Sequence, residues 1–204
     1  MHHTQVRASR ALRAALLLPS LLFAACSGGD VVVLKVNVNP DSSGTVSVRG
    51  MRARPEPATY EAATKGAEWQ DRVEAFAVRG TFPALAGLDL GGITFAPSKG
   101  DNGAKSLRVT VLLGEDARWC KATAPAIADQ KRVSTVFQAD GATGTVGTEA
   151  TLMIDLPGEV IGVGHAPGVR GVQSSREGKR ATLLLPVKSV LERAGKLTFD
   201  ITWQ

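Results

Sequence analysis

Apolar and polar residues alternate in two neighbouring segments near the start of the chain. From residue 32 to residue 38, valine or leucine occupies every second position with Lys35 and Asn37 between them, and the alternation returns at 45–49. The intervening residues 39–44 are Asn, Pro, Asp, Ser, Ser and Gly, which favour turns. Because side chains of a strand point alternately to its two faces, this pattern predicts a β-hairpin with one buried face.

Other segments have the periodicity of helices. In residues 59–79 the apolar positions fall on one helical stripe, and oppositely charged residues stand four apart on the other side. We expect this segment to be the longest helix of the chain, ending at Gly80. Shorter helices are expected at 81–86, at 115–123 before Pro125, and at 187–194 before Gly195.

Most of the remaining chain has the composition of strands separated by Gly, Pro and Ser. Residues 90–95 and 106–113 flank Asp101-Asn102-Gly103, and Asn-Gly is a strong hairpin signal. The last segment, 197–203, alternates without error, which predicts a strand of the core sheet. Further strands are expected at 133–137, 145–156, 160–163, 169–173 and 181–187.

This order of elements predicts the fold class. Hairpins dominate and long helical crossovers are few, so we expect an α+β domain with a mainly antiparallel sheet and a few short helices packed on one side. The 204 residues, 44% hydrophobic and 21% charged, suit one globular domain.

The N-terminal segment has the pattern of an export signal. Residues 1–13 carry three arginines and no acid, and residues 14–25 are apolar except for Pro19 and Ser20. Twelve residues of helix cover roughly 18 Å, less than the ~30 Å of a hydrocarbon core, so a permanent membrane span is not expected.

The end of that segment, Leu22-Phe23-Ala24-Ala25-Cys26, resembles the lipobox of bacterial lipoproteins, in which small residues precede a lipidated cysteine. The sequence departs from the family pattern at Phe23, where an aliphatic residue is usual. The resemblance implies that residues 1–25 are removed and that Cys26 becomes an acylated first residue. Ser27, in place of the Asp that signals inner-membrane retention in the enterobacterial type, points to the outer membrane where the source has one. The alternative is an ordinary secretory signal, with Cys26 unmodified or in a disulfide between two copies.

The resemblance divides the chain into a removed segment 1–25, a tether 26–30 and a single domain 31–204. Five tether residues span at most about 18 Å, so the domain is expected to lie against the lipid headgroups. Basic residues Arg49, Arg52 and Arg54 would then lie near anionic lipid or form a solvated edge.

The charge balance argues against a nucleic-acid partner. The formal net charge is +5, but Arg7, Arg10 and Arg13 lie in the segment expected to be removed. The rest of the chain has 21 basic and 19 acidic residues, without the large excess typical of nucleic-acid binders.

Few residues suited to catalysis or metal binding remain after the leader. His165 is then the only histidine, and Cys120 the only cysteine besides Cys26, which excludes multi-histidine zinc sites and CxxC motifs. We predict no cofactor and no metal. A Cys120/His165 dyad, as in envelope peptidases, is the alternative to a buried Cys120 thiol in a short helix and a solvated His165 in a turn.

Two further patterns resemble known sites only in part. Asn37, Asn39 and Asp41 resemble the first ligands of a calcium loop, but Ser42 and Val48 replace the required Gly and Glu, so a capped turn is expected.

The second pattern is the glycine-rich segment 158–173. It lacks the third glycine of a dinucleotide motif, and we interpret it as a bulged edge pair, with a ligand-binding lip as the alternative.

These observations predict a lipid-anchored protein of the bacterial envelope whose domain binds or scaffolds without catalysis. Its partner beyond the membrane would be an envelope lipid, a glycan or a protein. The alternative function is an envelope hydrolase whose active site uses carboxylates or a nucleophile that no motif reveals.

Overall fold

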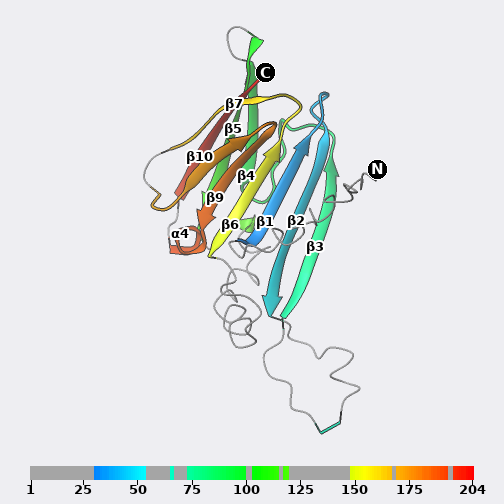
Figure 1. Cartoon of the computed structure of the whole chain (residues 1–204), viewed down its shortest axis with the longest axis vertical. Coiled ribbons are helices and arrows are strands. Elements are labelled where there is room, and N and C mark those ends of the chain that lie inside the picture. Colours follow the sequence, from blue (N-terminus) through cyan, green and yellow to red (C-terminus); the bar gives the residue numbers. More distant parts are fainter. Residues whose placement is uncertain are drawn as a thin grey trace, which may run out of the picture.

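The computed structural model describes residues 30–53, 65–66, 73–99, 103–114, 117–119, 148–166, 169–192 and 195–204. In these residues two sheets pack face to face (Figure 1). The larger has the order β3-β2-β1-β6-β9-β8 and the smaller the order β4-β5-β10-β7. Their bounds are β1 Asp30–Val38, β2 Gly44–Ala53, β3 Val73–Phe82, β4 Ile93–Lys99, β5 Lys105–Leu113, β6 Glu149–Asp155, β7 Val160–His165, β8 Gln173–Glu177, β9 Arg180–Pro186 and β10 Gly195–Trp203.

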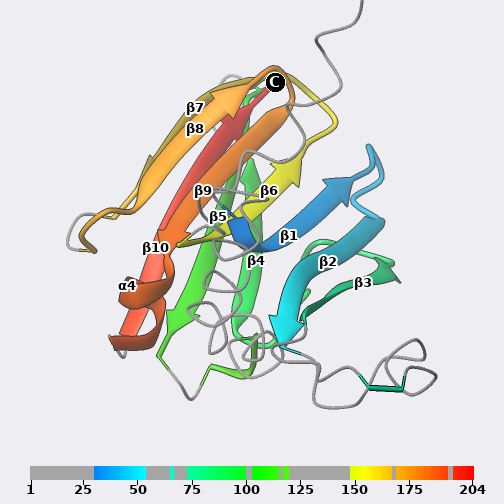
Figure 2. The ribbon, with the colours of Figure 1, turned by 60° about the horizontal axis from the view of Figure 1, so that its bottom comes forward.

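The expected α+β class is wrong. The described chain is mostly β, and α4, Val187–Glu192, is a short helix at one end of the sandwich (Figure 2). The physical reason lies in what covers each sheet. The apolar inner face of one sheet packs against the apolar inner face of the other, so the core needs no layer of helices.

The long helix expected over 59–79 is contradicted where the structure describes it. Residues 73–82 form β3, paired with β2 from Gly44 opposite Phe82 to Ala53 opposite Val73. A helix and a strand both place residues four apart on one face, so the apolar spacing did not separate the two. The short helix expected at 81–86 is also wrong, because the strand continues to a buried Phe82 and turns follow it.

Several other expectations are confirmed. The first hairpin pairs β1 with β2, the second pairs β4 with β5, and β10 follows α4 to the end of the chain. The strand expected at 169–173 is displaced, since β8 begins at Gln173. Three expected elements lie wholly or partly outside the described residues. They are the strand at 133–137, most of the short helix at 115–123, and residues 59–64 and 67–72 of the long helix.

One pairing was not expected from the hairpin pattern. β1 and β6 run parallel, with Leu34 opposite Leu152 and Val36 opposite Ile154. This pairing joins the N-terminal hairpin to the β6-β9-β8 half of the larger sheet, so the sheet is mixed and not antiparallel throughout.

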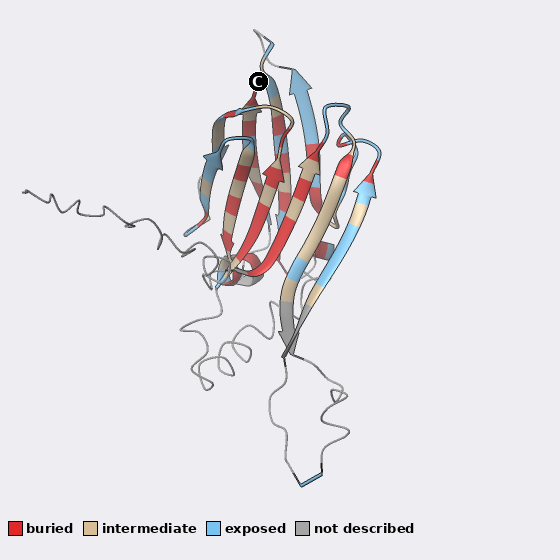
Figure 3. Cartoon of the chain, turned by 45° about the vertical axis from the view of Figure 1, so that its right-hand side comes forward, coloured by how far each residue is buried: buried red, intermediate tan, exposed pale blue. Residues whose placement is uncertain are grey.

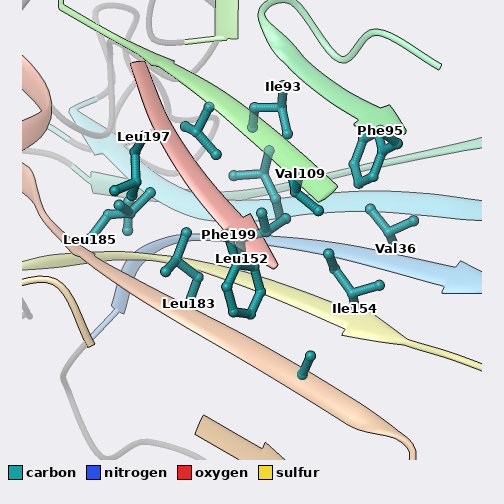
Figure 4. Close-up of a cluster of buried hydrophobic side chains, with 14 of the residues drawn as sticks. Val36, Ile93, Phe95, Val109, Leu152, Ile154, Leu183, Leu185, Leu197 and Phe199 are labelled. Carbon is teal, nitrogen blue, oxygen red and sulfur yellow. The ribbon is translucent and has the colours of Figure 1, made fainter. Parts of the chain in front are cut away.

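The core lies between the two sheets (Figure 4). Phe199 of β10, Val109 of β5 and Ile154 of β6 are fully buried there. Burying each such side chain stabilises the fold by about 1.5–3 kcal/mol. Burial decreases toward β3, which is mostly exposed in Figure 3, and Val78 on the inner face of that strand is 64% exposed.

The other edge of the sandwich is closed by β7 and β8. Arg176 Nη1 of β8 donates to the Val160 carbonyl at 2.7 Å, and the Val160 amide donates to the Gly178 carbonyl at 2.9 Å. The register of β7 against β10 shifts between Thr202 and Trp203, which marks a bulge. The interpretation of this glycine-rich segment as a bulged edge pair is therefore confirmed for β7.

A tight corner fixes the start of β4. The Trp119 amide donates to the Gly91 carbonyl at 2.7 Å, and the Trp119 indole Nε1 donates to the Leu112 carbonyl at 2.6 Å. The Asp89 carboxylate accepts a hydrogen bond from Arg118 at 2.6 Å. Gly91 has φ +79°, and a Cβ there would lie 2.8 Å from the Trp119 backbone nitrogen.

We predict that Gly91→Ala lowers the free energy of unfolding by about 2–4 kcal/mol, because a left-handed backbone and a backbone clash combine. Gly87→Ala is the matched control, since its φ is +83° but a Cβ would meet nothing within 4 Å. It should cost only about 1 kcal/mol in urea unfolding. Equal losses in the two variants would contradict the close approach to Trp119.

Candidate binding pocket

A pocket of about 350 Å³ opens at one pole of the sandwich. Segments from both sheets reach this pole, at the top of Figure 1. They are the turn after β1, the facing ends of β4 and β5, the loop after β6 and the end of β10. The start of β1 at Asp30 and the helix α4 lie at the opposite pole. The pocket therefore gathers segments that are distant in the sequence.

The apolar part of the pocket is made by the end of the core. Leu85, in the segment after β3, is 2% exposed, and Trp203 at the end of β10 is 6% exposed. The Trp203 position is held by the chain end, because the Glu159 and Gln204 backbones exchange two hydrogen bonds of 2.9 and 3.1 Å. Pro157 adds a rigid wall from the same loop.

The cationic part of the pocket comes from β4 and β5. Lys99 is the last residue of β4, and its register partner is Lys105, the first residue of β5. Lys105 is also the register partner of Trp203. The three residues thus form one row across three adjacent strands, and the two lysines are exposed.

The rim of the pocket includes the turn that resembled a calcium loop. The Asp41 carboxylate accepts hydrogen bonds from the Ser43 amide at 3.0 Å and the Ser43 hydroxyl at 2.7 Å, and these bonds lower the pKa of Asp41. Asn39 Nδ2 donates to the same hydroxyl at 3.0 Å, and Asn37 Nδ2 donates to Thr45 at 2.9 Å. The interpretation as a capped turn is confirmed.

An ion-pair cluster lies on the outer face of the larger sheet. The Asp155 carboxylate is 2.9 Å from the Lys35 ammonium group and 2.7 Å from the Arg180 guanidinium group. Partial burial raises the pKa of Asp155, but hydrogen bonds from Arg180 and Lys35 and their positive charges outweigh it and hold the pKa below 3.8. The cluster joins β1, β6 and β9 and is structural.

Among the described residues singled out from the sequence, Asn39 lines the pocket, whereas His165 and Arg49 do not. Cys26, Cys120 and Arg54 lie outside the described residues. His165 ends strand β7 and is half-buried, with Nδ1 3.1 Å from the Ser174 hydroxyl, so its expected place in a solvated turn is wrong. Arg49 is exposed and lies opposite Val33, near the start of β1.

Sequence reasoning missed Lys99 and Lys105. The signal was present, because Lys99 continues the alternation that buries Ile93 and Phe95 on β4. Lys105 likewise precedes the buried alternation of β5 that begins at Leu107. A lysine at an inward-facing position of a strand indicates that the buried core ends at that position.

Comparison of the chain with protein-family models, with curated proteins and with solved structures finds no match. Among the described residues, no helix is long and apolar enough to cross a membrane. The same residues hold no group of three or more side chains placed to bind a metal ion.

The described lining of the pocket offers ammonium, hydroxyl and amide groups beside apolar surface. It includes no carboxylate, imidazole or thiol, the groups most often used for proton transfer or nucleophilic attack. This arrangement is chemically suited to binding.

We predict that Asp155→Asn lowers the free energy of unfolding by about 1 kcal/mol near pH 7, since its partly exposed partners are screened by solvent. The lowered pKa makes this contribution present above about pH 4, and it should disappear as the pH falls through that lowered pKa. Urea unfolding at pH 7 and at pH 2.5 checks both statements.

Asp200→Asn provides the control for that experiment. Asp200 accepts two hydrogen bonds from Arg108, at 2.7 and 3.0 Å, but both side chains are more than half exposed. Its loss should be smaller than that of Asp155→Asn at pH 7. An Asp155→Asn deficit of the same size at both pH values would contradict an ionic contribution.

Proposed function

We propose that the chain is a lipoprotein of the bacterial envelope, acylated at Cys26, and that its β-sandwich is a non-catalytic binding domain. The observation that carries the anchor is the segment 22–26, with small residues directly before Cys26 at the end of an apolar run. The chemistry of the pocket supports binding as the role of the domain. The partner class is an envelope lipid, a glycan or a protein.

The distance between Cys26 and the sandwich supports a fixed position at the membrane surface. β1 begins at Asp30, so only three residues separate it from Cys26. The five tether residues, 26–30, reach at most about 18 Å even when fully extended. Two or three acyl chains would hold the protein at the bilayer, because each buried methylene contributes about 0.8 kcal/mol.

The direction of β1 supports an outward-facing pocket. The strand has nine residues, and a rise of about 3.3 Å per residue separates Asp30 from Val38 by about 26 Å. Val38 lines the pocket, whereas Asp30 adjoins the tether. The binding pole is therefore proposed to face away from the membrane, toward the periplasm or the cell exterior.

The envelope-hydrolase alternative would use carboxylates or an unrecognised nucleophile, and its carboxylate form gains no support from the pocket, since the described lining holds no carboxylate.

We predict that intact-mass analysis of the protein from a bacterial membrane fraction finds a chain beginning at Cys26 and carrying a diacylglyceryl thioether. Cys26→Ser should abolish the acylation and the cleavage before residue 26, because serine offers no thiol to form the thioether. Cys120→Ser is the matched control and should retain the wild-type lipid mass and fractionation. Recovery of an unacylated chain from the medium would contradict the proposal.

A further inference from the structure

The row Lys99–Lys105–Trp203 carries charge, whereas the rest of the inner face of β4, β5 and β10 is apolar. One step further into the sandwich, the row contains Pro97, Leu107 and Ile201, and the last two are 1% exposed. The inner face is thus apolar up to its last row, where two positive charges stand beside a tryptophan at the pocket. Charge at this place is not needed for the core.

The two ammonium groups belong to directly opposite residues of an antiparallel pair. Like charges in that position destabilise a sheet, by a few tenths of a kcal/mol to about 1 kcal/mol. Within the part of the chain that the structure describes, no carboxylate lies within ion-pair distance of either lysine. An anion placed between them would remove the repulsion.

Three other cations on the strands of this domain are paired with carboxylates, whereas no ion pair of the described residues involves Arg49, Arg79 or Lys196. Lys35, Arg108 and Arg180 each have a carboxylate partner within 3.0 Å. Lys99 and Lys105 differ from the other unpaired cations in their position, because they are directly opposite each other and both line the pocket. A negative charge that neutralises this facing pair would come from outside the described chain.

We propose that the pocket binds a small anionic ligand. Its carboxylate or phosphate group would lie between Lys99 and Lys105, and its body would contact Leu85, Pro97 and Trp203. The volume of about 350 Å³ is at the lower end of ligand pockets, which suits a single sugar-sized unit. This inference rests on the proposed binding role of the domain, but it does not depend on acylation of Cys26.

The test is a calorimetric titration of the full protein, purified in detergent, with glucuronate, glucose 6-phosphate, inorganic phosphate and glucose. The first two probes join an anion to a sugar-sized body and distinguish a carboxylate from a phosphate. We expect at least one of them to bind, at least tenfold more tightly than glucose or inorganic phosphate, with an affinity that falls as salt is raised. The indole NMR signal of Trp203, assigned by its loss in Trp203→Phe, should shift on binding.

The double variant Lys99→Gln/Lys105→Gln should weaken binding of that probe at least tenfold, because both charged contacts are lost. Lys196→Gln is the matched control, since Lys196 is exposed near the other end of β10, and it should bind as the wild type does.

Three results would overturn the proposal: no binding of either anionic probe, equal binding of glucose, or unchanged binding by the double variant. Self-association of the double variant without any probe binding would instead assign the lysines to protection of the β4 edge. Binding of glucose alone would leave the proposed binding role standing and reject only its anionic ligand. Acylation of Cys26 is tested separately, by the mass of the N-terminus, and its outcome does not depend on these titrations.

Discussion

The parallel pairing of β1 with β6 is the contact on which the arrangement of this domain depends. It sets Leu34 beside Leu152 and Val36 beside Ile154, so two hydrophobic stretches more than 100 residues apart form the middle of one sheet. Without it, the three strands β3, β2 and β1 would have no hydrogen-bonded neighbour in the β6-β9-β8 half, and the larger sheet would fall into two parts. The same register brings the turn after β1 beside the loop after β6, where the pocket forms.

Alternation along the strands explains both the core and the pocket. The inner positions of β5 and β10 are buried from the α4 pole almost to the far pole, because the larger sheet covers them. At the last row Trp203 is still buried, but the inner positions of β4 and β5 are exposed at the pocket. Lys99 and Lys105 occupy that row, so the periodicity that buries Phe95 and Leu107 also aims two charges at the rim.

The sequence predicted the local elements whose partners are close in the chain. The alternations at 32–38, 106–113 and 197–203 became β1, β5 and β10, since each has an unambiguous period of two. It failed for 73–82, where Val73, Phe76 and Ala77 fit a helical stripe and only pairing with β2 selects the strand. Tertiary pairing, and not local residue spacing, therefore determines that residues 73–82 form a strand and not a helix.

The pocket was beyond sequence reasoning for a different reason. Its walls come from segments around residues 40, 85, 99, 157 and 203, and no motif links them. Their meeting follows from the strand order of two sheets, in particular from β10 lying next to β5. The sequence carries one signal of the pocket: the apolar alternations of β4 and β5 each have a lysine, Lys99 or Lys105, at their pocket end.

The separation between the anchor and the pocket bears on what the lysines would bind. In the proposed orientation, β1 places the pocket about 26 Å from the tether, or roughly three Debye lengths at physiological salt. The potential of anionic lipids is largely screened at that height, so headgroups would not compete for Lys99 and Lys105. Arg49 lies near the start of β1 instead and, in that orientation, would be within reach of the membrane surface. In that orientation the fold would separate Arg49, on the side of the membrane, from Lys99 and Lys105, on the side of the proposed ligand.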